Sequence, residues 1–285
     1  MIKSMKLRRI LSDSAIYTVL SVLSVIWLLP IVYIVITSFR GEPGSWLDGY
    51  IMPKIWTIRN YTRLFTDTSQ FNYPRWFLNT FVVAVFSCLL STIYVLFTSY
   101  AFSRLRFRMR RPMMNVVLVL GMFPGFMSII AVYHLIKLIG LDQSLVALVL
   151  IYSSGAGLGY YIMKGFFDTI PGALDESAYL DGCTKWMTFK KITLPLSRPI
   201  ITYTVLTAFI GPWVDFIAAS VIMKDNYNNY TIALGLFRML ERENVTVWYT
   251  SFTAGAVLVS IPIATLFLVM QRNYVEGVTG GAVKG

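Results

Sequence analysis

The pattern of hydrophobic and polar positions divides this chain into long apolar runs separated by shorter polar segments. Six runs are about 20 residues or longer, which is the length an α-helix needs to cross the hydrocarbon core of a bilayer. They are Ile16 to Ser38, Phe77 to Ser103, Met113 to Tyr133, Ser144 to Met163, Ile200 to Met223 and Tyr249 to Met270. Because the runs are continuous and lack the alternation of barrel strands, we expect helices. The pattern therefore predicts an all-α polytopic membrane protein with six transmembrane helices.

The composition also favours a bilayer environment. Charged residues make up 14% of the chain and hydrophobic residues 56%, with a mean hydropathy of +0.64, whereas a soluble domain carries about a quarter charged residues. Lys3, Lys6, Arg8 and Arg9 precede the first run. That run is too long for a signal peptide, and no small-residue cleavage site follows it. We expect it to remain as a helix.

The distribution of basic residues indicates the orientation of the helices. The net charge is +11, and Lys and Arg are denser in the segments that lie inside if the N-terminus is cytoplasmic. The densest cluster lies in a short loop and comprises Arg104, Arg106, Arg108, Arg110 and Arg111. Such a cluster favours a topology signal beside anionic lipid over nucleic-acid binding. We expect a multi-pass plasma-membrane protein with both termini cytoplasmic.

This topology divides the chain into three parts. Residues 1–13 form a cytoplasmic N-terminus, residues 14–271 a transmembrane domain and residues 272–285 a cytoplasmic C-terminal tail. Within the transmembrane domain, residues 164–199 form one long cytoplasmic segment. A simple connection needs only a few residues, so this segment requires an explanation.

The first half of the 164–199 segment has the features of a short helix. Pro171 suits the first turn of a helix, and Asp175 and Glu176 complement the positive end of its dipole. Gly182 follows at a position where a glycine can end the helix in the left-handed conformation.

The second half predicts another short helix at an angle to the first. Thr184 can cap its N-terminus, and we expect Pro195 to stop it. With Leu174 and Ala178 on one face of the first helix, the pair would form a compact projection suited to docking. A helical hairpin without a partner is the alternative.

The same segment resembles the cytoplasmic loop of ABC-importer permeases. That loop has the form Glu-Ala-Ala, three residues, Gly, nine residues and Ile-x-Leu-Pro. The matching or adjoining residues here, with the spacing intact, are Glu176, Ser177, Ala178, Asp181, Gly182, Ile192, Leu194 and Pro195. Ser177 departs from the first Ala of the pattern but is nearly as small.

Other stretches are similar to the MalG-like second permease subunit of maltose-type carbohydrate importers. They are Asn60-Tyr61, Leu64-Phe65, Asn79-Thr80, Ser99 to Arg104, Gly140-Leu141, Gln271-Arg272 and Val275 to Gly285. The resemblance covers nearly the whole chain and implies the fold of a type I ABC importer permease (MetI-like). The function it implies is a bacterial inner-membrane permease subunit for maltose, maltodextrin or a related oligosaccharide.

The resemblance also implies a set of partners. These are a second homologous permease subunit, a dimeric ABC ATPase that binds ATP and Mg, and an extracytoplasmic sugar-binding protein. The 164–199 segment would fit a cleft on the ATPase, with Glu176 facing basic residues. In the tail, Lys284 would lie near the ATPase, although a tail frayed in solvent is an open alternative.

A candidate substrate path lies in the fifth apolar run. Asp215 is the one carboxylate well inside a predicted helix, and a charge inside the membrane is costly enough to indicate function. It follows Gly211, Pro212 and Trp213, where the proline removes a backbone hydrogen bond and should kink the helix. Trp213 and Phe216 would stack against sugar rings or help to close the pore. A structural pairing of Asp215 within the helix bundle remains the alternative.

The sequence offers little chemistry of its own. It contains no Gly-x-x-x-x-Gly-Lys-Ser/Thr motif for ATP, and the single histidine, His134, cannot supply a multi-histidine metal site. We therefore expect no catalytic site, metal or cofactor in this chain, and ATP hydrolysis by a partner. The alternatives are an ABC permease for a non-sugar solute and, with less support, a secondary transporter, which needs more ionisable groups in the membrane.

Overall fold

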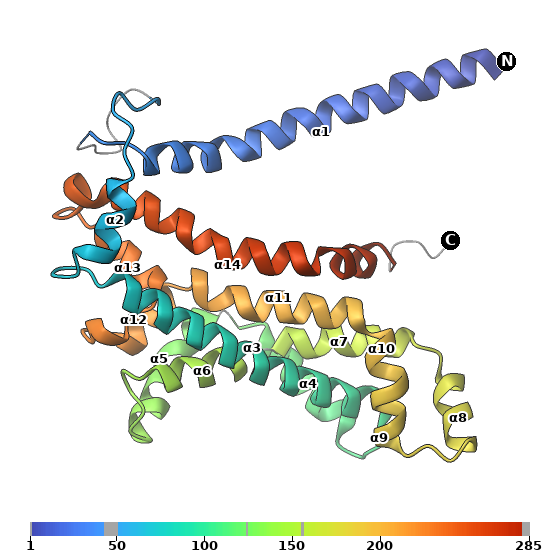
Figure 1. The fold of residues 1–285 in the computed structure, drawn as a ribbon. Helices are drawn as coiled ribbons and strands as arrows, with labels where there is room; N and C mark the ends of the chain where they lie inside the picture. Colours follow the sequence, from blue (N-terminus) through green and yellow to red (C-terminus); the bar gives the residue numbers. More distant parts are fainter. Residues whose placement is uncertain (1, 43–50, 124, 155–156, 281–285) are drawn as a thin grey trace. The chain divides into compact units, whose positions relative to one another are not determined.

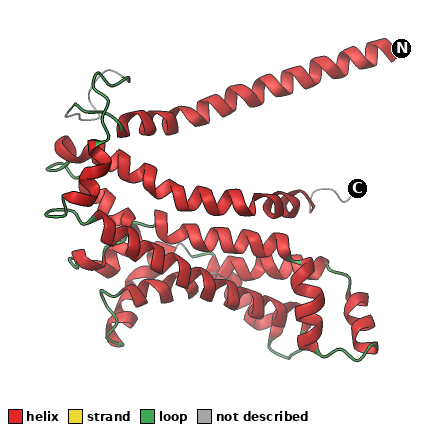
Figure 2. Cartoon of the chain, viewed as in Figure 1, coloured by secondary structure: helices red, strands yellow, loops and turns green. Residues whose placement is uncertain are grey.

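The structure is a computed structural model that describes residues 2–42, 51–123, 125–154 and 157–280. Those residues form helices joined by loops, without a β-strand, as the all-α prediction requires (Figure 2). The one strand-like contact in this part of the chain is an isolated bridge between Arg40 and Trp56.

The helices are shown in Figure 1. In chain order they are α1 (Ile2–Ser38), α2 (Arg59–Thr66), α3 (Tyr73–Arg104), α4 (Arg110–Gly121), α5 (Gly125–Leu138), α6 (Leu145–Ser154), α7 (Gly157–Thr169), α8 (Gly172–Leu180), α9 (Lys185–Thr188), the π-helical η1 (Phe189–Thr193), α10 (Leu194–Leu196), α11 (Arg198–Val214), α12 (Ile217–Met223), the 3₁₀-helical η2 (Tyr227–Asn229), α13 (Ile232–Met239) and α14 (Val245–Gly280).

Three of these helices are long and apolar enough to cross a membrane, and two bent pairs raise the number of candidate spans to five. The three are within α1, α3 and α14, and the bent pairs are α6 with α7 and α11 with α12. The remaining expected span, Met113 to Tyr133, is not one continuous helix, because α4 ends at Gly121 and α5 begins at Gly125. The described residues therefore do not confirm six spans.

The chain forms two compact units. One comprises residues 1–71 and 238–258, and the other comprises residues 72–237 and 259–285. In the first unit, Asn60 of α2 is buried and donates hydrogen bonds to the carbonyl oxygens of Ser38 (2.9 Å) and Arg40 (2.7 Å). The Thr250 hydroxyl donates to the side-chain oxygen of Asn60 (3.0 Å). One amide side chain thus ties α2 to the end of α1 and to α14.

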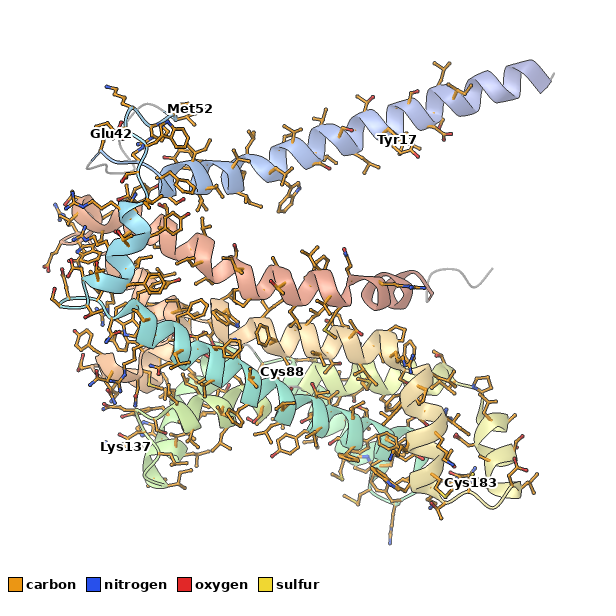
Figure 3. All side chains as sticks on the ribbon, viewed as in Figure 1. Tyr17, Glu42, Met52, Cys88, Lys137 and Cys183 are labelled. Carbon is orange, nitrogen blue, oxygen red and sulfur yellow. The ribbon has the colours of Figure 1, made fainter. Side chains whose placement is uncertain are left out.

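In the second unit, α3 is the central helix and packs against α6, α7 and α11. Small residues occupy its buried face, among them Ala84, Ser87, Ser91 and Ser99. Small side chains allow close approach of helix backbones in membranes, where packing rather than hydrophobic exclusion drives association. The opposite face carries exposed Phe86, Leu89 and Ile93, which suits a surface in contact with lipid or another apolar surface. Cys88, which is labelled in Figure 3, lies near the middle of α3.

Candidate functional site

The 164–199 segment folds into the two helical pieces that its residues predict. Pro171 directly precedes α8, one position earlier than the first turn we expected. Gly182 follows the end of α8 with φ +80° and so takes the left-handed conformation. Thr184 caps α9, since its side-chain oxygen accepts a hydrogen bond from the N–H of Met187 (3.3 Å). Figure 3 marks the turn between the helices by Cys183.

The prediction for Pro195 is wrong, because this proline does not stop the second helix. The chain continues from α9 through the π-helical η1 into α10, and Pro195 lies in the first turn of α10. A proline ring ordinarily clashes with the carbonyl group four residues earlier. The wider turn of the π-helix immediately before it gives the ring space. The helical path instead breaks at Ser197, after which α11 begins.

The motif residues of α8 present a mixed surface. Glu176, Ser177, Asp181 and Gly182 are exposed, whereas Ala178 is buried. In the second piece, Ile192 and Leu194 are half-buried and Pro195 is exposed.

Large apolar side chains accompany these exposed polar groups. Leu180 is 89% exposed, and Leu174 and Tyr179 of the same helix are each 42% exposed. Isolated surface leucines are ordinary, but apolar groups clustered on a short helix beside carboxylates are typical of a protein contact surface. The arrangement fits docking of another protein on α8.

An ion pair of the buried residue Asp175 holds α8 against the end of α3. Asp175 is buried, and one of its oxygens (Oδ2) lies 3.2 Å from Nε of Arg104, the last residue of α3. The same guanidinium group donates through Nη2 to the carbonyl oxygens of Phe167 (3.0 Å) and Ile170 (2.8 Å). Arg104 therefore binds the end of α7, the link to α8 and α8 itself. A planar guanidinium with several donors in fixed geometry suits such a junction.

Further contacts connect the same end of α3 to the 164–199 segment. Ser103 donates to Oδ1 of Asp168 (2.6 Å), which also pairs with Lys164, and the Tyr100 hydroxyl donates to the carbonyl oxygen of Lys185 (3.1 Å). The Tyr100 ring lies 4.6 Å from that of Phe189 between centroids. These contacts surround a buried apolar cluster of Val95, Tyr100, Met163, Phe167, Ile170 and Phe189.

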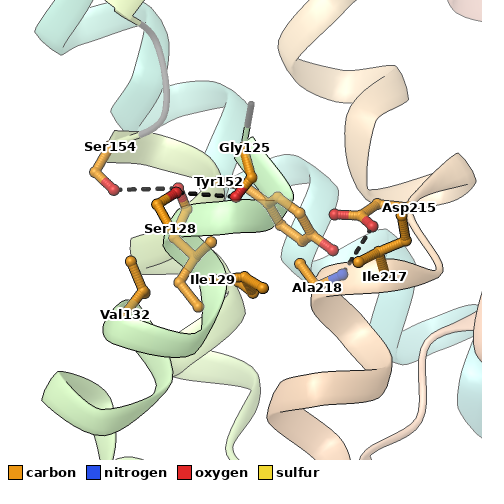
Figure 4. Close-up of a pocket in the computed structure, with 10 residues that line it drawn as sticks. Gly125, Ser128, Ile129, Val132, Tyr152, Ser154, Asp215, Ile217 and Ala218 are labelled. Carbon is orange, nitrogen blue, oxygen red and sulfur yellow. Dashed lines mark hydrogen bonds between the residues drawn. The ribbon is translucent and has the colours of Figure 1, made fainter. Parts of the chain in front are cut away.

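A second candidate site is a cavity of 480 Å³ at the break between α11 and α12 (Figure 4). The volume lies in the range of small-molecule pockets, about 300–1,000 Å³. Its lining residues come from α5, α6, α12 and the α11–α12 break: Gly125, Ser128, Ile129, Val132, Ile151, Tyr152, Ser154, Asp215, Ile217 and Ala218.

Asp215 lies at the helix break that the sequence predicts. The chain bends by 56° between α11 and α12, and Asp215 takes an extended conformation there. Its Oδ1 accepts a hydrogen bond from the N–H of Ala218 (3.0 Å), at the start of α12. Figure 4 shows the phenol of Tyr152 directed toward this carboxylate. Among the described lining residues, Asp215 is the one ionisable carboxylate, and the hydroxyl-bearing side chains are Ser128, Tyr152 and Ser154.

The other residues expected in the substrate path lie elsewhere. Trp213 is 2% exposed and packs edge-on against Phe77, with ring centroids 5.2 Å apart, so it does not line the cavity. Phe216 packs against Phe237 with centroids 4.2 Å apart. Gly211 and Pro212 belong to the last turns of α11, and Pro212 is buried. Lys284 lies outside the described residues.

Sequence reasoning missed the roles of Arg104 and Tyr152. The sequence pattern places Arg104 with four neighbouring arginines as a topology signal. Arg104 differs from them in lying at the end of the buried face of α3. Arg106 and Arg108 are exposed, as expected of topology residues. Tyr152 lies in an uninterrupted apolar run that gives no sign of a facing carboxylate.

Apolar helices long enough to cross a membrane, together with bent helix pairs, are typical of the class of helical membrane transport proteins. The chain matches the family described as "Binding-protein-dependent transport system inner membrane component" over residues 94–280. It belongs to this family, and so is a membrane component of a transport system.

Relatives and solved structures agree with this assignment. The chain is 37% identical to the galactooligosaccharides transport system permease protein GanQ of Bacillus subtilis (strain 168), covering 100% of both chains. It is 33% identical to the maltodextrin transport system permease protein MalD of Streptococcus pneumoniae, covering 99% of both. Its fold matches a chain of a bacterial ABC transporter that imports the acidic polysaccharide alginate, with a TM-score of 0.76, 20% identity, and 91% and 95% coverage. The expectation of an ABC importer permease fold is confirmed.

Proposed function

We propose that this chain is a permease subunit of an ATP-driven importer for maltodextrin or a related oligosaccharide. The observation that carries the proposal is end-to-end similarity to permeases for galactooligosaccharides and maltodextrin, at 37% and 33% identity. With a second homologous permease, the chain would form half of the translocation pathway. Both termini would lie in the cytoplasm of a bacterial cell.

The surface of α8 would dock the ATPase subunits, which bind ATP and Mg. Glu176 and Asp181 offer exposed carboxylates for basic residues of the partner, and Leu180 offers an apolar group to bury. Aliphatic side chains of this size contribute roughly 1.5–3 kcal/mol when fully buried. Gly182 permits the turn that presents these groups.

The cavity at Asp215 would form part of the substrate path. The lining of the cavity is largely apolar but includes a carboxylate, a phenol and two serine hydroxyl groups. Such a lining suits sugars, which carry both hydroxyl groups and apolar ring faces. Residues 224–248 follow the fifth apolar run and would therefore lie outside if the N-terminus is cytoplasmic. There they would meet an extracytoplasmic binding protein.

Co-purification from the native membrane tests the docking role. We expect an ATPase to co-purify with the wild-type chain and to be lost from Glu176→Ala and Gly182→Asp. Glu243→Ala removes an exposed carboxylate outside the 164–199 segment and should retain the ATPase. A wild-type chain that purifies without an ATPase would contradict the proposal.

Uptake by the reconstituted complex tests the substrate class. We expect uptake of labelled maltodextrin that requires ATP and a binding protein. Uptake that persists without ATP would favour a secondary transporter. ATP-dependent uptake of peptide or phosphate but not of any oligosaccharide would favour a permease for a non-sugar solute.

A further inference from the structure

Helix α3 differs from the other spans in its continuity. Among the described residues, the unbroken candidate spans are those in α1, α3 and α14. Pro30 lies inside the first, and Gly255 and Pro262 lie inside the third. α3 has 32 residues, its only proline is in the first turn, and it contains no glycine. At 1.5 Å per residue it extends about 48 Å, without the residues that usually cause kinks.

One end of α3 is bonded to the 164–199 segment. Arg104 pairs with Asp175 at 3.2 Å and donates to one carbonyl group at the end of α7 and one in the α7–α8 link. Tyr100 donates to a carbonyl group at the start of α9. The side chains of the ion pair are 13% and 9% exposed, so water screens this pair less than a surface pair. A displacement of α8 would therefore reach α3 directly.

The other end of α3 forms several hydrogen bonds with residues 227–232. Arg75 donates to the carbonyl oxygen of Asn228 (2.8 Å), and Trp76 donates through Nε1 to that of Tyr227 (2.9 Å). Asn79 donates to the carbonyl oxygens of Asn228 (2.9 Å) and Tyr230 (3.0 Å).

Two more contacts tighten this attachment. The N–H of Ile232 donates to the Thr80 hydroxyl (2.7 Å), and Gly235 of α13 lies directly against the Trp76 ring. Four residues near the start of α3 thus hold one connecting segment: Arg75, Trp76 and Asn79 donate to its carbonyl groups, and Thr80 accepts from its backbone N–H. This segment and the first turns of α3 should move as one body.

We propose that α3 is a rigid link that transmits displacement of the ATPase-docking segment to the 227–232 segment on the opposite side of the membrane. Arg104 and Asn79 are the positioning residues at its two ends. The proposal rests on the proposed function and deepens it, because it assigns communication between ATPase and binding protein to one helix. The bent pairs α6–α7 and α11–α12 can absorb displacement at their breaks, whereas α3 cannot.

The exposed face of α3 allows its stiffness to be tested without disturbing either end. We would replace Phe86, Leu89 and Ile93 with glycine in one variant and with alanine in another. Both variants lose the same side chains, but glycine restores backbone freedom that alanine does not. Each would be reconstituted in the full complex, and ATP hydrolysis would be measured with and without the liganded binding protein.

We expect both variants to show wild-type basal hydrolysis, with stimulation by the binding protein reduced at least five-fold in the glycine variant alone. If the binding protein stimulates ATP hydrolysis equally in the two variants, the proposal that α3 is a rigid link is overturned. A wild-type complex without binding-protein-dependent hydrolysis would instead overturn the proposed function, and with it this proposal.

Conservative changes at the two ends supply a second test. Asp175→Asn keeps the shape of the side chain and breaks the ion pair, and Asn79→Leu removes the bonds to Asn228 and Tyr230. Each should reduce stimulation by the binding protein, while Asn229→Ala should not, because Asn229 binds the carbonyl oxygen of Gln143 rather than α3. Unchanged stimulation in both end variants would contradict the positioning roles.

Discussion

Gly235 lies so close to Trp76 that any side chain there would displace its neighbours: a Cβ atom at position 235 would be 1.9 Å from the indole Cε3. The indole is 2% exposed and cannot swing away as the tip of a flexible chain would. The glycine therefore determines how closely α13 packs on the first turns of α3.

Gly235→Ala should destabilise the protein by about 1–3 kcal/mol, the range found for overpacked cores. Thermal unfolding of the purified complex in detergent measures the effect. Gly165→Ala is the matched control, because no atom lies within 4 Å of its expected Cβ and alanine is favoured in helices. Adding Trp76→Leu to Gly235→Ala should recover part of the loss, and failure to do so would show that the ring is not the obstacle.

Gly182 should be sensitive to substitution for a different reason. Space is available around it, with no atom within 4 Å of a Cβ there, but its φ of +80° is unfavourable for other residues. Gly182→Ala should therefore cost about 1–2 kcal/mol in the local stability of the turn, and Gly182→Asn should cost less, since asparagine tolerates this conformation.

Limited proteolysis between α8 and α9 provides the measurement for Gly182. Gly172→Ala is the control, because it has similar space and no positive φ. Equal cleavage rates for the alanine variants at positions 172 and 182 would contradict the role of backbone conformation.

Asn60 should be difficult to replace in the first unit. Asn60→Ala leaves two buried carbonyl groups without their donor, and each unsatisfied group costs about 1–3 kcal/mol. Asn60→Asp should be worse, because a carboxylate would face two carbonyl oxygens. Protease resistance of the segment between α1 and α2 reports the loss. Thr250→Val, which removes a single hydrogen bond, should have a smaller effect, and the reverse order would refute this account.

Asp215 allows its charge to be separated from its structural hydrogen bond. Asp215→Asn retains an oxygen that can accept from Ala218, whereas Asp215→Ala loses it, at a cost of about 1 kcal/mol by analogy with helix caps. If the charge contacts substrate, both variants should transport more slowly with little difference between them. If Asp215 is only structural, Asp215→Asn should transport like wild type in reconstituted vesicles.

The sequence anticipated features that depend on local composition. Apolar length predicted α3 to within a few residues, and Pro212 predicted the break at Asp215. The residues of the 164–199 segment predicted a first helix, a left-handed Gly182 and a second helix capped by Thr184. In each case the cause lies within one or two helical turns, so no knowledge of distant neighbours is needed.

The tertiary structure decided which of several similar residues had a particular role. Arg104 is one of five neighbouring arginines, and only the approach of α8 to the end of α3 gives it Asp175 as a partner. Trp213 is one of several aromatic residues near the helix break, and its position on α11 packs it edge-on against Phe77.

By itself the sequence thus determined the helical membrane class and the two short helices of the 164–199 segment, because these follow from hydrophobic length and backbone chemistry. Only the tertiary structure decided that one end of α3 binds the 164–199 segment while the other end binds residues 227–232. It also decided that Trp76 packs directly on Gly235 and that Asp215 and Tyr152 line the same cavity. These are contacts between residues 60 to 160 positions apart, and their geometry depends on how whole helices pack.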